Sequence, residues 1–146
     1  MKTRVLLTAL LAGLVGSTTA ARRVAPQPEY VLIVNRNNPV TALASTEVGK
    51  IFLKKAELWP DGTPTAPVDL AESSPVRASF TREILKRTVP AIKSYWQQEA
   101  FSGRDVPPPE EASDADVVDV VRSIPGAIGY VSPNAQLRGV KTVSVR

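Results

Sequence analysis

The stretch Tyr30-Val31-Leu32-Ile33-Val34 is a continuous run of apolar, largely β-branched residues, followed by the polar segment Asn35 to Pro39. A run of this length and composition is typical of a strand that is buried on both faces. Such strands lie in sheets that are covered by helices. The run therefore predicts a sheet with helices packed against it.

Helices are indicated on the C-terminal side of this run. Four starts are predicted from an N-cap residue or from a proline in the first turn: Ser45 or Thr46, Ser74-Pro75, Pro90 and Ser113. The last helix is predicted to end at Pro125-Gly126. Apolar faces at helical spacing are formed by Val48, Ile51 and Phe52, by Val76, Phe80 and Ile84, by Ile92, Tyr95 and Trp96, and by Val117, Val120, Val121 and Ile124. Arg77 is expected to lie away from the apolar row of the second helix.

Three further strands are predicted at residues 67–70, 127–131 and 140–145, and the last of them is expected at an edge of the sheet. The order of elements is then β-α-β-α-α-α-β-β. Helical segments between apolar strands predict a three-layer α/β domain with a mixed sheet.

The N-terminus has the pattern of a secretory signal peptide. Lys2 and Arg4 flank the start of an apolar run from Val5 to Val15, and small uncharged residues follow at positions 16–21. The run is too short to span a bilayer as a mature helix. We expect residues 1–20 to be cleaved, leaving residues 21–146 as one domain in the periplasm, with no membrane insertion after cleavage. A buried or anchoring N-terminal helix is the alternative.

Composition excludes several functional classes. The chain has 146 residues without cysteine or histidine, which removes thiolate nucleophiles, Ser-His-Asp triads and the usual zinc ligands. The acidic residues between positions 110 and 119 do not have the spacing of an EF-hand loop. The net charge falls from +4 to +2 without residues 1–20, and no basic stripe is present. We therefore expect no enzyme, no metal or cofactor and no nucleic-acid partner.

Several segments together resemble a known family. Residues 34–40 (VNRNNPV) and 48–55 (VGKIFLKK) resemble its "VN..NP…IFLGK" stretch, and residues 125–131 (PGAIGYV) are the same as its "PGAIGYV" motif. Ser73-Ser74-Pro75-Val76 stands where the family has a Gly-Ser-Gly-Thr turn that opens a helix. By these motifs the chain resembles the phosphate-binding proteins, the periplasmic receptors of phosphate ABC importers. The resemblance runs from about Tyr30 to Val131.

The resemblance covers one of the two lobes of such receptors, the second. It implies an α/β fold, a three-layer mixed-sheet single lobe of the periplasmic binding protein type II kind. It also implies an exported solute-binding module that takes phosphate or a similar oxyanion for ABC-type uptake or sensing. The partner would be a membrane transporter, or a protein that supplies the missing lobe.

The residues that match the family's anion-binding turn are the candidate site. A helix N-terminus offers unpaired N–H groups and a partial positive charge, which favour an oxyanion. The predicted anion-binding residues are Ser73, Ser74, Val76, Arg77 and, from a glycine-containing loop, Arg104. Ser74-Pro75 can equally be an ordinary helix start.

Three residues of the turn depart from the family pattern, and Ser73 stands in place of its first glycine. Pro75 lacks an N–H group and Val76 lacks a hydroxyl group, and Leu70 stands near the place of a family arginine. These departures motivate the alternative function: a periplasmic interaction or sensory module that kept the lobe but lost the anion site, and so binds no ligand.

Overall fold

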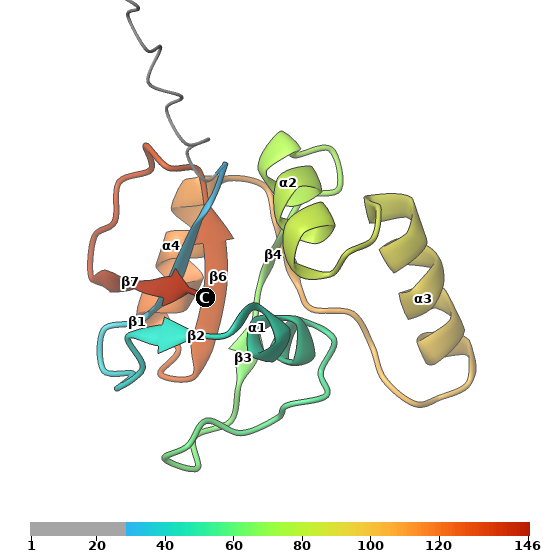
Figure 1. Cartoon of the computed structure of the whole chain (residues 1–146), viewed down its shortest axis with the longest axis horizontal. Helices are drawn as coiled ribbons and strands as arrows, with labels where there is room; N and C mark the ends of the chain where they lie inside the picture. The colour runs from blue at the N-terminus through green and yellow to red at the C-terminus, as the bar shows by residue number, and fades with distance from the viewer. Residues whose placement is uncertain (1–28) are drawn as a thin grey trace, which may run out of the picture.

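The computed structural model describes residues 29–146, and the predicted signal peptide lies outside this part of the chain. The elements are β1 (Val31–Asn35), β2 (Ala42–Leu43), α1 (Ser45–Phe52), β3 (Ala66–Pro67), β4 (Asp69–Leu70), α2 (Pro75–Ile84), α3 (Val89–Phe101), β5 (Glu110–Glu111), α4 (Asp114–Ser123), β6 (Ala127–Val131) and β7 (Val140–Val145) (Figure 1). None of the helices described is long and apolar enough to cross a membrane.

The main sheet is mixed, as the sequence predicts. Its order is β2-β7-β1-β6-β3, with β1 antiparallel to both β6 and β7 and with β3 parallel to β6. The chain continues from β3 to β4 through Val68, whose N–H donates to the carbonyl of Ile128 at 2.9 Å. Because β4 pairs in parallel with β5, the strands β6, β3–β4 and β5 all run in one direction.

One strand lies elsewhere than predicted. The sequence places residues 140–145 at an edge of the sheet, but β7 lies between β1 and β2, with β2 parallel to it. The edge strand β2 and the strand β5 each have two residues. Segments this short carry no period-two pattern, so the sequence does not indicate them.

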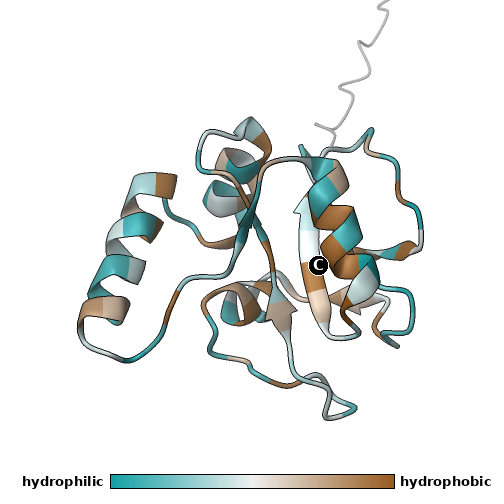
Figure 2. Ribbon diagram, turned by 180° about the vertical axis from the view of Figure 1, so that it is seen from behind, coloured by the Kyte–Doolittle hydropathy of each residue, from teal (hydrophilic) through white to brown (hydrophobic). Residues whose placement is uncertain are grey.

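Helices cover both faces of the sheet, which confirms the three-layer prediction. Tyr130 points to the side of α1 and α2, where its ring lies near Phe52 and Phe80. Its neighbour Gly129 faces α4 on the opposite side, close to Val117. Seen from behind, α4 lies over β6 with apolar and polar residues on different sides (Figure 2). Helix α3 stands apart from the sheet, beyond α2 (Figure 1).

The core between the sheet and helices α1 and α2 is largely aromatic. The rings of Phe80 and Tyr130 are stacked, with centroids 3.9 Å apart and an interplanar angle of 8°. Phe52 and Tyr30 approach Phe80 with centroid distances of 4.7 and 5.3 Å. Offset and edge contacts of this kind contribute beyond the burial of apolar area. They fix α1 and α2 on one face of the sheet.

Two of the three asparagines in the 34–40 segment, Asn35 and Asn38, have structural roles. The Asn35 amide donates to the carbonyls of Val121 and Arg122, both at 3.0 Å, and so ties the end of β1 to the end of α4. The Asn38 side chain accepts from the Val40 N–H at 2.9 Å. These side chains satisfy backbone groups at a strand end, which explains the amides without a ligand.

Several local predictions need correction. Ala44 is the N-cap of α1 instead of Ser45 or Thr46, and the Glu47 carboxylate accepts from the Ala44 N–H in place of a hydroxyl cap. Helix α3 begins at Val89, one residue before Pro90, and is capped by Thr88. Ile124 is 43% exposed because it follows the last turn of α4, and Val118 is buried in that helix. The caps Ser74 and Ser113 are confirmed.

Candidate functional site

Helix α2 starts at the carboxyl end of β4, the edge at which open α/β sheets commonly bind ligands. Ser74 has an extended backbone, and its hydroxyl oxygen accepts from the Arg77 N–H at 3.4 Å. Pro75 occupies the first helical position and has no N–H group to offer. Among the described residues, the Val76 N–H has no hydrogen-bond partner. It is therefore the backbone donor that this helix start presents.

Helix α4 begins at the same edge, after β5, but its start is filled by its own carboxylates. Asp116 accepts from the Ser113 hydroxyl at 2.6 Å, and Asp114 accepts from the N–H of Ser132, just beyond β6, at 3.1 Å. These acidic residues complement the helix dipole within the chain. Of the two helix starts, α2 is therefore the one suited to an external anion.

Two hydroxyl groups accompany the free N–H of Val76. Ser73 is exposed, and Ser74 and Val76 are half-buried. Each serine hydroxyl can donate one hydrogen bond to an oxyanion, and the Ser74 oxygen meanwhile keeps its role as the cap. The structure thus places Ser73, Ser74 and Val76 together at one helix start.

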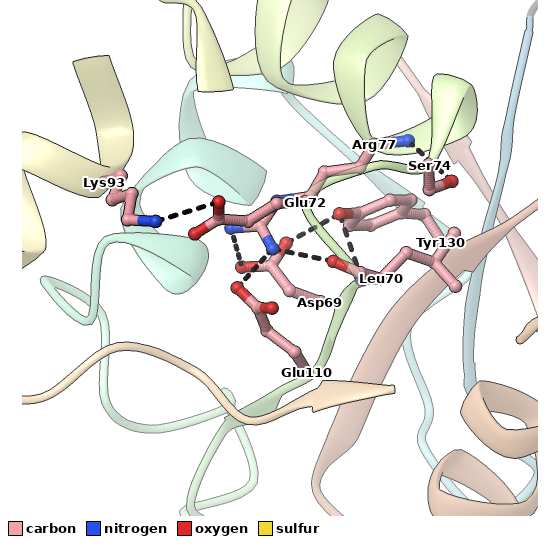
Figure 3. Close-up of polar contacts among 8 residues, drawn as sticks. All are labelled: Asp69, Leu70, Glu72, Ser74, Arg77, Lys93, Glu110 and Tyr130. Carbon is pink, nitrogen blue, oxygen red and sulfur yellow. Dashed lines mark hydrogen bonds and ion pairs between the residues drawn. The ribbon is translucent and has the colours of Figure 1, made fainter. Parts of the chain in front are cut away.

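Arg77 is buried, in contrast to its predicted place off the apolar row. Its exposed fraction is 4%, because its side chain turns back from α2 toward β4. Nη1 donates to the Leu70 carbonyl at 2.7 Å and to Oε1 of Glu110 at 2.5 Å, and Nη2 lies 3.6 Å from Oδ2 of Asp69 (Figure 3). The guanidinium group is therefore engaged by two carboxylates of the chain itself.

Asp69 is a buried carboxylate with a second partner. The Tyr130 hydroxyl donates to Oδ1 of Asp69 at 2.6 Å and accepts from the Leu70 N–H at 3.3 Å. Burial raises the pKa of Asp69 above its ordinary value, against the lowering effects of Arg77 and Tyr130. Burial and the nearby Asp69 charge raise the pKa of Tyr130. Although burial lowers the pKa of Arg77, its two carboxylate partners raise it above the ordinary value, so the guanidinium stays charged.

A cavity of about 260 Å³ lies beside this cluster, between the start of α2, the side of α3 and the segment before β5. Charged groups at its wall are paired: Arg77 with Glu110, and Lys93 with Glu72 at 3.1 Å (Figure 3). Trp96 and Pro107 supply apolar wall. Across the part of the chain described, no group of three or more acidic side chains is arranged to hold a metal ion.

Arg104 lies apart from the other candidates. It follows the end of α3, where its guanidinium pairs with Glu99 at 2.9 Å. It does not line the cavity next to Arg77. The structure therefore does not bring this arginine to the start of α2.

Sequence reasoning missed three members of the polar cluster: Asp69, Glu110 and Tyr130. The sequence position of Asp69 indicates a buried carboxylate, because it stands between Val68 and Leu70 in a segment predicted to be a strand. A buried acid needs a partner. The sequence does not indicate Glu110 as a member of the cluster, because its strand β5 has two residues and pairs with β4 across a long sequence separation.

A comparison with protein-family models and one with curated proteins each found no match. A comparison with solved structures did. An ABC-type phosphate transport receptor from Vibrio cholerae has a TM-score of 0.63 and 20% identity, covering 80% of this chain and 46% of the receptor. A phosphate ABC transporter substrate-binding protein with bound phosphate, from Clostridium perfringens, has the same score and identity, covering 80% of this chain and 44% of that one.

A third solved structure, PstS from Borrelia burgdorferi, has a TM-score of 0.62 and 17% identity, covering 81% of this chain and 47% of its own. This chain thus spans under half the length of each of these proteins. The described part of the chain has the periplasmic binding protein fold seen in phosphate ABC transporter substrate-binding proteins, over less than half of such a protein.

Proposed function

We propose that this protein is an exported, non-enzymatic binding module for phosphate or a similar oxyanion, acting in ABC-type uptake or sensing. The proposal rests on the hydrogen-bond donors found at the start of α2. There the Val76 N–H, which has no partner within residues 29–146, is two residues from Ser74 and three from Ser73, whose hydroxyls can donate to the same anion. Of the solved proteins with this fold, one is described as an ABC-type phosphate transport receptor and another as a phosphate ABC transporter substrate-binding protein with bound phosphate.

The electrostatics of this helix start favour a weakly held anion. The helix dipole places partial positive charge at the start of α2, and the first turn contains no acidic residue to neutralise it. A periplasmic binding protein encloses its ligand by closing two lobes around it. The chain spans under half of the receptors it matches, so we propose that a partner or a second copy supplies the opposite wall.

Calorimetric titration of the purified protein with phosphate at low salt, with sulfate as the control anion, tests this function. We expect saturable binding of phosphate. Ser73→Ala removes a hydroxyl that caps nothing, and Ser74→Gly removes the other at little cost to the cap, since glycine is tolerated there. Each variant should weaken phosphate binding by about tenfold, the loss of one hydrogen bond to a charged ligand.

Ser113→Gly, which alters the cap of α4 in the same way, is the matched control. It should leave phosphate binding unchanged. Equal binding by all four proteins would place the anion elsewhere and exclude the start of α2. No heat with either anion, from a folded sample, would exclude the isolated chain as a phosphate binder.

The alternative function is a periplasmic interaction or sensory module that binds no anion. The observation that favours it is the engagement of Arg77 by Asp69 and Glu110, which leaves no free guanidinium face for a ligand. The same titration separates the two functions. Absence of phosphate binding, together with recovery of a defined partner by crosslinking in the periplasm, would favour the interaction module.

A further inference from the structure

The contact between Glu110 and Arg77 differs in kind from the other contacts of this arginine. The Leu70 carbonyl and the Asp69 carboxylate are buried and hold the guanidinium from the side of β4. The Glu110 side chain is 40% exposed and meets Nη1 from the side of the cavity. Figure 3 shows Glu110 approaching the guanidinium from a different strand than Asp69 and Leu70. Glu110 is therefore the one partner that can leave without uncovering the core.

We propose that the Glu110 carboxylate is an internal substitute for a ligand oxyanion on Arg77, and that it limits how tightly this module takes phosphate. The inference rests on the proposed function, because it takes the ligand to be the same oxyanion. It adds Arg77 and the cavity beside it, which Ser73, Ser74 and Val76 do not line. It gives Glu110 a role in setting the affinity for phosphate, in addition to the residues at the start of α2.

The hydrogen bonds of Arg77 Nη1 indicate where a ligand oxygen could bind. One of its two hydrogens is donated to the Leu70 carbonyl and the other to Glu110. Without the Glu110 carboxylate, the second N–H would face the cavity of about 260 Å³, which has room for a tetrahedral oxyanion. A phosphate oxygen could then accept this bond in place of the carboxylate oxygen. A charge-assisted bond of this kind is stronger than one between neutral groups.

The charges around Arg77 determine whether loss of the Glu110 carboxylate strengthens or weakens phosphate binding. Asp69 stays beside Nη2 and is neutralised by Arg77, so Glu110 is the remaining negative charge on the guanidinium at the cavity wall. Lys93 at the same wall is already paired with Glu72. Removal of the Glu110 charge therefore changes the net charge of these paired groups from −1 to zero, which removes a repulsion against an anion.

Variants of the two neighbouring residues of β5 make the test. Glu110→Ala frees Nη1, and Glu110→Gln removes the charge but keeps an oxygen that can accept from it. Glu111→Ala is the matched control, because Glu111 is the adjacent residue of β5 and its side chain forms no ion pair with Arg77. Each protein is titrated with inorganic phosphate at low salt, with sulfate in parallel, and the Arg77 side-chain N–H resonances are followed by NMR.

We expect Glu110→Ala to bind phosphate at least about tenfold more tightly than the unchanged protein. Glu110→Gln should show a smaller gain, and Glu111→Ala no gain. Phosphate should shift the Arg77 resonances more strongly in Glu110→Ala than in the other proteins. Equal affinities for Glu110→Ala and the unchanged protein, whether both bind or neither does, would overturn the inference.

The same titrations test the proposed function separately from this inference. Phosphate binding by the unchanged protein without a gain in Glu110→Ala would overturn this inference and leave the proposed function standing. Binding by Glu110→Ala alone would support the inference and count against the proposed function of the natural chain. A gain of equal size in Glu111→Ala would show a general charge effect and overturn the specific role of Glu110.

Discussion

The hydroxyl of Tyr130 donates to the Asp69 carboxylate at 2.6 Å, joining strand β6 to strand β4 inside the protein. Both residues are at least nine-tenths buried, and the Tyr130 ring is stacked on Phe80 of α2. One side chain thus packs in the aromatic core and satisfies the carboxylate that holds Arg77. The polar cluster and the hydrophobic core are therefore built on the same residue.

Tyr130→Phe should lower the free energy of unfolding by about 1 to 3 kcal/mol. The substitution keeps the stacked ring but leaves an Asp69 oxygen and the Leu70 N–H without their partner. Urea unfolding followed by tryptophan fluorescence measures the change. Tyr95→Phe is the control, since Tyr95 is half-buried on α3 and should change stability by less than about 0.5 kcal/mol. A Tyr130→Phe protein as stable as the unchanged one would show that the hydroxyl contributes nothing net.

Much of the fold follows from local sequence signals. Four residues of the run Tyr30 to Val34 lie in the largely buried strand β1 (Val31–Asn35), as the composition predicts, because a strand covered on both faces does not alternate apolar and polar residues. Ser74 and Ser113 are N-caps because each has an extended backbone and a hydroxyl oxygen that accepts a hydrogen bond from an N–H group in the first turn of its helix. The strand β2 and the pairing of β4 with β5 were not predictable, since two-residue strands are defined by their partners.

The site was predictable only in part. The serines and Val76 follow from the position of one helix start, which is local information. The burial of Arg77 is not local: its carboxylate partners come from β4 and β5, and Glu110 lies 33 residues away in sequence. An arginine in a first turn suggests a free charge until the fold shows which acids face it. The sequence does not indicate the pairing of Arg104 for the same reason: its partner Glu99 lies at the end of α3.

Stability should fall as the pH rises above about 10. Burial, with a contribution from Glu83, raises the pKa of Tyr30 to about 12, whereas an unfolded tyrosine titrates near pH 10. Between about pH 10 and 12 the folded protein binds more protons than the unfolded chain, so the free energy of unfolding decreases with rising pH. The raised pKa of Tyr130 adds in the same direction.

Urea unfolding at a series of pH values from 8 upward, to about 11.5, measures this dependence. Tyr30→Phe should flatten the decrease without abolishing it, because Tyr130 still contributes. Tyr95→Phe should flatten it less, since that ring is less buried. Identical pH profiles for Tyr30→Phe and the unchanged protein would show that Tyr30 ionises normally in the folded state.

Gly129→Ala should destabilise the protein by about 1 to 3 kcal/mol, the usual cost of overpacking a core. Gly129 lies in β6 on the face covered by α4, and a Cβ atom there would lie 2.7 Å from Cγ1 of Val117 and 3.2 Å from Cγ2 of Val121. Both valines are fully buried, so neither can turn away without moving α4. The glycine is thus explained by the close approach of helix and sheet, with no ligand involved.

Gly49→Ala is the matched comparison, because the same methyl group enters a different environment. In α1 the new Cβ would meet nothing closer than 3.6 Å, an ordinary contact with the Ile84 carbonyl oxygen. Alanine also favours a helix interior over glycine, so this variant should gain about 0.5 to 1 kcal/mol. Urea midpoints that move in opposite directions for the two variants would establish that α4 is packed on β6 at the spacing described. A neutral Gly129→Ala would mean that α4 can shift outward at no cost, and that the glycine has another cause.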